Sequence, residues 1–147
     1  MDYEDVAKNI APFLAAYLLQ IPRVWGDHTR VHSHTGCALN NTLFNTVSGD
    51  IYLEEYVFFG HNVCLLTGTH DITKTGRGRI EGHPTAGRDI RIHKGAWLAS
   101  NVTVLGPCEI GENAVIAAGS LVIGDVPPNC IYAGTPAKFI KKIEFAT

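Results

Sequence analysis

Residues 92–127 repeat with a period of six. Branched aliphatic residues hold one place in the repeat: Ile92, Leu98, Val104, Ile110, Ile116 and Val122. Small or β-branched residues follow four places later: Ala96, Val102, Cys108, Ala114, Ser120 and Val126. Residues that favour turns lie between them: Gly95, Asn101, Pro107, Asn113, Gly119 and Asp125. This period fits neither a helix of about 3.6 residues per turn nor an alternating strand. It predicts an all-β parallel β-helix of hexapeptide repeats.

The same period is present earlier in the chain, where Val47, Leu53, Phe59 and Leu65 hold the aliphatic or aromatic place. The distance from Leu65 to Ile92 is not a multiple of six. We therefore expect residues 67–89 to be looped out of the repeat. A long polar loop in a compact repeat is usually functional or disordered.

The two ends of the chain indicate helices in a single domain, 1–147. Residues 2–21 have an apolar face at helical spacing, interrupted by Pro12, and we expect this helix to cover one open end of the β-helix. The β-helix is predicted over 22–127, with one irregular coil before residue 47. A short helix is predicted over 136–145, because Pro136 suits a first helical position.

Composition excludes several classes of function. The net charge of −2 gives no general attraction to nucleic acid or to an anionic membrane. The four cysteines are far apart, so we expect them to be reduced and the location to be cytoplasmic. The apolar run from Ile10 to Ile21 is too short for a membrane span, and acidic residues precede it.

His70 lies at the start of the looped-out segment and is followed by Asp71. Imidazole titrates near neutral pH, so a histidine in this position suits proton transfer. A solvated loop residue is the alternative. His32 and His34 alternate on an extended segment, but no third ligand has a defined metal spacing. We therefore expect no metal.

Three motifs resemble those of the hexapeptide-repeat O-acetyltransferases. They are the run Leu66-Thr67-Gly68-Thr69-His70-Asp71, the repeat followed by Val126-Pro127-Pro128-Asn129, and Ala133-Gly134-Thr135-Pro136-Ala137-Lys138. The chain is similar to the galactoside and maltose acetyltransferases and to the colanic-acid type of polysaccharide acetyltransferase. The resemblance implies a left-handed β-helix and a homotrimer with active sites between subunits. It also implies direct acetyl transfer from acetyl-CoA, without an acyl-enzyme, with His70 as the general base.

The resemblance extends to other residues one at a time. Trp97, Ser100 and Ala118 match positions along the pantetheine arm and thioester of CoA, although each also suits an ordinary role in the coil. Two lysines, Lys138 and Lys141, replace arginines near the CoA phosphates. Asn45 matches an acceptor-binding asparagine, with a turn role as the alternative. The family commonly has Thr-Lys where this chain has Ile123-Gly124.

Residues 72–94 carry six cations and two anions, a net charge of +4. This charge indicates either a solvated loop or a cleft that attracts an anion, such as CoA or an acidic or phosphorylated sugar. Asp71 and His83 are further candidates for contact with the acceptor.

The sequence therefore predicts an acetyl-CoA-dependent O-acetyltransferase that acts on a saccharide. One alternative is an N-acetyltransferase acting on a nucleotide-linked amino sugar. A metal enzyme like the γ-class carbonic anhydrases is disfavoured, because no two histidines have the five-residue separation which that class requires. The remaining alternative is a non-catalytic repeat scaffold.

Overall fold

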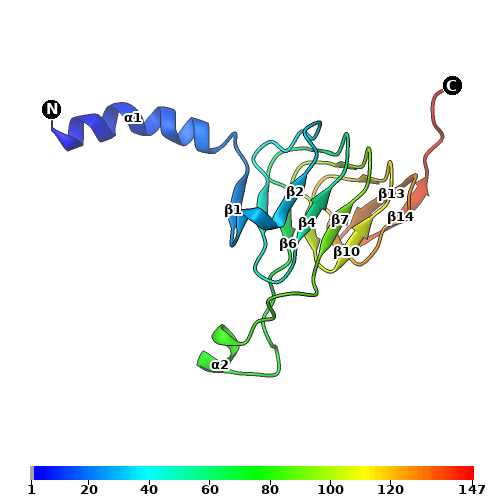
Figure 1. Ribbon diagram of the computed structural model, residues 1–147. Helices are drawn as coiled ribbons and strands as arrows, with labels where there is room; N and C mark the ends of the chain where they lie inside the picture. Colours follow the sequence, from blue (N-terminus) through cyan, green and yellow to red (C-terminus); the bar gives the residue numbers. More distant parts are fainter. Residues whose placement is uncertain (1) are drawn as a thin grey trace.

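The computed structural model describes residues 2–147. Its strands form three sheets that enclose one core like the faces of a prism (Figure 1). The chain visits the three sheets in turn, so strands stacked in successive coils are parallel. This arrangement confirms the predicted parallel β-helix and is consistent with its left-handed form.

The strands divide among the sheets as follows. The first sheet stacks β1 (Arg23–Trp25), β3 (Leu43–Asn45), β6 (Cys64–Leu66), β9 (Thr103–Leu105) and β12 (Leu121–Ile123). The second sheet stacks β2 (Val31–Ser33), β4 (Ile51–Leu53), β7 (Ile90–Ile92) and β10 (Cys108–Ile110). The third sheet stacks β5 (Phe58–Phe59), β8 (Trp97–Leu98), β11 (Val115–Ile116), β13 (Cys130–Gly134) and β14 (Ala137–Lys142). A 3₁₀ helix, η1 (His28–Arg30), precedes β2.

The core follows the six-residue period. All twelve predicted inward side chains are buried, and seven of them have no exposed surface at all: Ala96, Leu98, Val102, Val104, Ile110, Ala114 and Ile116. The backbone has positive φ at Gly95, Asn101, Asn113 and Gly119, as expected for tight corners. Replacing a fully buried Leu98 by Ala should destabilise the fold by roughly 2–5 kcal/mol.

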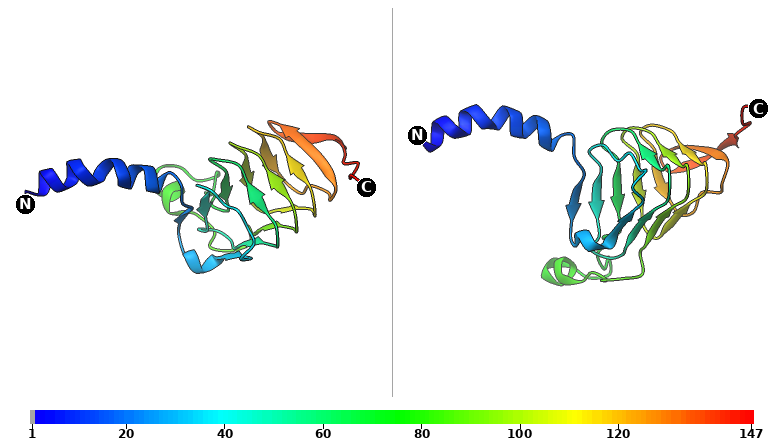
Figure 2. Two further views of the ribbon diagram at one scale, coloured as in Figure 1. Left: turned by 90° about the horizontal axis from the view of Figure 1, so that it is seen from above. Right: turned by 45° about the horizontal axis from the view of Figure 1, so that its top comes forward.

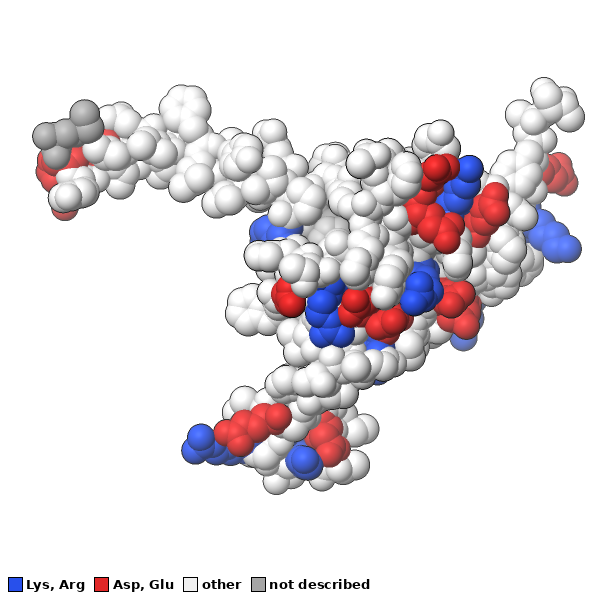
Figure 3. Space-filling model, in the orientation of Figure 1, with Lys and Arg blue, Asp and Glu red and all other residues white. Residues whose placement is uncertain are grey.

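The outer faces of the sheets differ in chemistry. The second sheet presents a row of polar or charged groups formed by His32, Tyr52, Arg91 and Glu109. Figure 3 shows basic and acidic side chains mixed across this face. The first sheet instead presents a mostly apolar face, which we call the apolar face. It consists of Leu43, Cys64, Leu66, Leu105, Leu121 and Ile123.

The N-terminal helix, α1 (Tyr3–Leu18), does not cover an end of the β-helix. It projects away from the first coil, and none of its residues is buried (Figure 2). The predicted helix is therefore present, but its predicted capping role is wrong for this chain. The helix passes through Pro12 without ending. No helix within residues 2–147 has the length and apolar character needed to cross a membrane.

The predicted C-terminal helix over 136–145 is wrong. Residues Ala137–Lys142 form β14, which pairs antiparallel with β13. The last coil leaves the edge of β13 unpaired, and a returning strand satisfies its backbone groups. Phe139 packs edge-on against Tyr132, with ring centroids 6.2 Å apart. A short apolar stripe fits a strand as well as a helix, and here the open edge decides.

The long loop is present as predicted. The chain leaves the repeat after β6 and re-enters it at β7, so residues 67–89 lie outside the coil. The loop extends from the body and contains a short helix, α2 (Gly76–Glu81), which the sequence did not predict (Figure 1).

Candidate active site

Hydrogen bonds of Thr67 and Arg88, which we call the neck, hold the base of the long loop at the corner between the first and second sheets. The buried Thr67 hydroxyl donates to the Asn45 carbonyl at 2.8 Å and accepts from the Ser48 amide at 3.1 Å. At the other end of the loop, Arg88 donates from Nε to the Thr67 carbonyl at 2.8 Å. A Cβ on Gly68 would lie 2.8 Å from the Asn45 side chain, so glycine permits this close approach. The loop therefore begins from a fixed position.

His70 is held in one orientation by the loop itself. Its Nδ1 atom lies 2.8 Å from the carbonyl oxygen of Arg79 in α2. A carbonyl only accepts, so Nδ1 carries a proton and donates it. In the neutral ring, Nε2 then has the free lone pair. His70 is exposed, and this tautomer presents a proton acceptor to solvent or substrate.

Arg79 supports this orientation with its side chain. Its Nε donates to the Lys74 carbonyl at 2.7 Å, and its Nη2 donates to the Ile72 carbonyl at 3.2 Å. The guanidinium thus links α2 to the loop segment that follows His70. This role of Arg79 could not be predicted from the sequence, because a loop arginine has no motif that distinguishes a structural from a solvated role.

Asp71 does not orient His70 in this structure. Its carboxylate accepts from the hydroxyl of Thr73 at 2.6 Å and from the Thr73 amide at 3.0 Å. These two hydrogen bonds hold the pKa of Asp71 below its usual value. Its amide donates to the Gly82 carbonyl at 2.7 Å. Asp71 therefore shapes the loop, and its predicted contact with acceptor stays a prediction.

A pocket of about 400 Å³ lies beside His70. Two predicted residues, Asn45 and His83, line it together with His70, and the His83 ring lies edge-on to His70 at 6.0 Å. The remaining lining residues were not predicted for the site: Trp25, Val47, Gly68, Thr69 and Ile80. Trp25 lies beside Asn45 because the two residues pair across the first two strands of the first sheet, in a coil where the six-residue period gives no signal.

The residues predicted to bind CoA lie elsewhere on the coil. Trp97 is in β8 on the third sheet, 41% exposed, with its ring stacked 5.7 Å from that of Phe58. Ser100 and Ala118 follow β8 and β11, at the corner between the third and first sheets. The Ser100 hydroxyl oxygen accepts from the His61 amide at 3.0 Å, which leaves its own hydrogen available to donate.

Lys138 and Lys141 are both exposed on β14, on the third sheet rather than on a helix. His70 lies in the loop that projects from the corner between the first and second sheets. The residues predicted to bind CoA lie on the third sheet or at the corner between the third and first sheets. A single chain therefore divides the predicted site residues between two corners of the prism, which the first sheet separates.

The cations of the loop have partners within the chain. Arg77 pairs with Glu81 at 2.6 Å, and Lys74 lies 3.7 Å from Asp71. Arg91 lies over the Tyr52 ring at 3.9 Å, and Lys94 pairs with Glu55 at 3.0 Å. None of these residues lines the 400 Å³ pocket, although Lys74 and His70 share a neighbouring hollow of about 340 Å³. The predicted attraction of an anion thus finds no support at this pocket.

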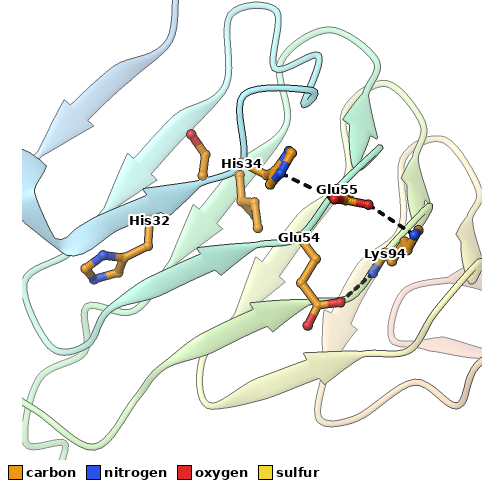
Figure 4. A pocket seen from close by; sticks show the side chains of 7 residues that line it. His32, His34, Glu54, Glu55 and Lys94 are labelled. Carbon is orange, nitrogen blue, oxygen red and sulfur yellow. Dashed lines mark hydrogen bonds and ion pairs between the residues drawn. The ribbon is translucent and has the colours of Figure 1, made fainter.

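Another hollow, of about 530 Å³, lies where the second sheet ends (Figure 4). His34, Glu55 and Lys94 face one another there and pair among themselves, at 3.5 Å and 3.0 Å. The nearby His32 pairs with Asp50 and stacks on Tyr52. Within residues 2–147, no group of three His, Cys, Asp or Glu side chains is placed to hold a metal ion. We place the candidate active site at His70 because the loop fixes its tautomer beside an open pocket.

Comparison with known proteins finds a family model that matches part of the repeat. Residues 89–124 match the family model of the bacterial transferase hexapeptide, six repeats. The galactoside O-acetyltransferase of Lactococcus lactis is 37% identical over 113 residues, which cover 77% of this chain and 53% of that protein. The chain is a relative of the hexapeptide-repeat acetyltransferases. This finding confirms the resemblance that the sequence motifs indicated.

Solved structures of the hexapeptide-repeat acetyltransferases agree in fold. A maltose O-acetyltransferase from Clostridium difficile has a TM-score of 0.58 at 24% identity, covering 98% of this chain and 80% of that one. A galactoside acetyltransferase in complex with coenzyme A has a TM-score of 0.53 at 26% identity, covering 82% of this chain and 62% of that one.

Relatives in this family differ in acceptor. Serine acetyltransferase 2 of Arabidopsis thaliana is 40% identical over 96 residues, covering 64% of this chain and 27% of that protein. The chain spans about half, or less, of the length of these curated relatives. These relatives are therefore named for different acceptors, a galactoside in one and serine in the other.

Proposed function

We propose that the chain is an acetyl-CoA-dependent O-acetyltransferase acting on a saccharide hydroxyl, with His70 as the general base. The hydrogen bond from His70 Nδ1 to the Arg79 carbonyl carries the proposal, because it leaves Nε2 free to accept a proton. The relatives named above as galactoside and maltose O-acetyltransferases support the choice of acceptor.

The reaction requires one base and no enzyme nucleophile. Nε2 of His70 takes the hydroxyl proton as the acceptor oxygen attacks the thioester carbonyl. The carbon–sulfur bond then breaks, the acetyl ester forms, and the imidazolium returns the proton to the departing CoA thiolate. The buried Cys108, whose pKa burial raises to about 12, is unsuited to nucleophilic catalysis.

Ser100 suits the thioester side of the reaction. Because its oxygen already accepts from the His61 amide, its hydrogen can donate to the carbonyl oxygen as negative charge develops. Trp97, Ala118, Lys138 and Lys141 supply an aromatic face, a small turn residue and positive charge along one sheet. These features suit an elongated, phosphate-bearing ligand such as CoA.

The site needs a second copy of the chain, and we propose a homotrimer. His70 and the CoA candidates flank the first sheet on opposite corners, and the apolar face of that sheet lies between them. Packing copies through the apolar face removes this surface from water. It also brings the His70 corner of one copy toward the CoA corner of the next.

Transfer to an amino group is the alternative for the same base. An amine acceptor that enters as the free base attacks without losing a proton first, so it depends less on His70. The two reactions are therefore separable by acceptor panel and by the effect of His70→Ala. A cytoplasmic location remains an expectation from the four free cysteines.

The test is release of CoA thiol from acetyl-CoA with a panel of sugars, amino sugars and nucleotide sugars. We expect a hydroxyl acceptor to support turnover and His70→Ala to abolish most of it. A thermal shift with CoA separates an enzyme from a scaffold. No shift with CoA and no thiol release with any acceptor would contradict the proposal.

A further inference from the structure

Trp25 has a large aromatic side chain that is exposed to solvent on the first coil. It lies at the end of β1 and is 70% exposed, although tryptophan is highly buried on average in folded proteins. Its strand partner is Asn45, so the two residues occupy neighbouring positions about 4.8 Å apart on the first sheet. Both line the pocket that contains His70.

The backbone around Trp25 is firmly held. Its carbonyl accepts from the Thr46 amide at 3.0 Å, and the Thr46 hydroxyl bonds both the amide and the carbonyl of Asp27 at 2.9 Å. Arg30 donates to the Thr46 carbonyl at 2.8 Å and to the Thr85 carbonyl at 3.1 Å. The first coil and the returning end of the loop are thus tied together around Trp25. An exposed aromatic on a fixed backbone suits ligand contact better than a mobile one.

The chemistry of the pocket is amphipathic and neutral. Trp25, Val47 and Ile80 supply apolar surface, and Ile80 is itself 70% exposed on α2. Asn45, Thr69, His70 and His83 supply groups that donate and accept hydrogen bonds. Among the described residues that line the pocket, none is Asp, Glu, Lys or Arg.

These observations distinguish between acceptor classes. The zwitterion of a free amino acid such as serine needs a cation for its carboxylate and an anion for its ammonium group, and the described lining residues include no Lys or Arg for the first and no Asp or Glu for the second. A pyranose ring has one apolar C–H face and a polar rim of hydroxyls. That pattern matches an aromatic face beside amide, hydroxyl and imidazole groups.

We infer that this pocket is a subsite for a neutral pyranose, in which Trp25 stacks on the sugar ring and sets the acceptor specificity. The inference rests on the proposed function for the role of His70, and it adds the acceptor-binding residue and the class of ring. Asn45 and His83 lie where they can bond the ring hydroxyls, while His70 receives the proton of the reacting one.

Binding can be tested without catalysis. The chain has two tryptophans, so a Trp97→Phe variant reports fluorescence from Trp25 alone. The probes are the methyl pyranosides of glucose, galactose and N-acetylglucosamine, titrated in the absence of acetyl-CoA, with L-serine as the comparison. We expect a saturable change with at least one pyranoside and none with L-serine.

Kinetics provide the second arm. Trp25→Ala should raise the acceptor KM roughly tenfold, the size of one aromatic contact, with the KM for acetyl-CoA unchanged. Trp25→Phe keeps an aromatic face and should restore most of the loss. Sedimentation of both variants checks that the assembly is intact.

The inference would be overturned by no saturable change with any pyranoside, by a saturable change with L-serine, or by an unchanged acceptor KM in Trp25→Ala. Dissociation of the Trp25→Ala assembly would assign Trp25 to a contact between copies instead, and would also overturn it. Pyranoside binding without any acetyl transfer would refute the proposed function but keep the subsite. Acetyl transfer with an unchanged acceptor KM in Trp25→Ala would refute the subsite but keep the proposed function.

Discussion

His70 is oriented by Arg79: the Arg79 carbonyl accepts from His70 Nδ1 at 2.8 Å, and the Arg79 side chain bonds the carbonyls of Ile72 and Lys74 in the loop between them. The group that fixes the histidine is thus a backbone carbonyl of α2, and not the carboxylate of the adjacent Asp71. The tautomer of the proposed base depends on the fold of a six-residue helix.

Removing the imidazole tests the assignment of the base. His70→Ala should lower kcat by roughly 10²–10⁴-fold, the usual cost of losing a general base, while the fold and the CoA affinity remain. His83→Ala is the matched control and should change mainly the acceptor KM. Near-normal turnover by His70→Ala would make His83 the next candidate.

Loosening α2 should slow the reaction without removing the base. Arg79→Ala deletes both bonds to the Ile72 and Lys74 carbonyls, and small displacements of a catalytic group cost roughly 10–100-fold in rate. Asp71→Asn is the comparison and should cost less, because Asp71 bonds Thr73 rather than His70. Steady-state kinetics of the two variants compares their losses in kcat. A larger loss in Asp71→Asn than in Arg79→Ala would contradict the assignment of Arg79 as the residue that positions His70.

The lysines of β14 should affect CoA rather than acceptor. Exposed charges act weakly and are screened by salt, so Lys138→Ala with Lys141→Ala should weaken CoA binding several-fold and make it less sensitive to salt. Isothermal titration with CoA at low and high salt measures both effects. Lys142→Ala on the same strand is the control. An unchanged affinity in the double variant would remove these residues from the site.

His93 should make stability depend on pH. It bridges three coils, with Nδ1 3.0 Å from Glu54 and Nε2 3.2 Å from Glu109. Burial alone would lower the pKa of His93, but the two carboxylates outweigh burial and raise it above the ordinary value of 6.5. The stabilisation is therefore fully present below the pKa of the unfolded chain and is lost as pH rises through the raised folded value.

The variant His93→Gln should consequently lose more unfolding free energy, relative to the wild type, at about pH 5.5 than at about pH 8.5. Denaturant unfolding at the two pH values measures the difference. The exposed His61→Gln, which keeps the backbone bond to Ser100, controls for the general effect of removing a histidine. An equal loss at both pH values would show that the bridge does not titrate in this range.

A charge on the apolar face should separate the copies. Ile123→Glu places a carboxylate on the first sheet at a position that is 62% exposed in the single chain. Sedimentation should show a trimer for the wild type and smaller species for the variant. Tyr52→Glu, in the outward polar row of the second sheet beside Arg91, should stay trimeric. A stable wild-type monomer at micromolar concentration would reject the trimer and with it a shared site.

The repeat could be predicted from the sequence because its information is local. Each inward residue, such as Leu98 or Ile116, is followed six places later by another. A segment looped out of the coil is detectable because it interrupts this six-residue spacing. The bounds 67–89 follow from that break. The exposed position of α1 and the strand β14 could not be predicted, because both depend on which edges and ends the finished coil leaves open.

The candidate site was predictable only where a motif exists. His70 and Asn45 follow from the family pattern, whereas Trp25 lies in the faint first coil, where the period is lost. The partner of His70 is a main-chain carbonyl, and any residue at position 79 supplies one. No side-chain pattern can therefore encode that contact, and the fold of the loop is needed to find it.

The neck at Thr67 and Arg88 closes the long loop on itself while β6 and β7 stack on the coils to either side. The stacking of the coils therefore does not depend on the length or composition of the loop between Thr67 and Arg88. Insertions, deletions or wholesale exchange there should leave the solenoid folded, so the wall of the acceptor pocket that the loop supplies can diversify while the wall supplied by Trp25 and Asn45 stays in place.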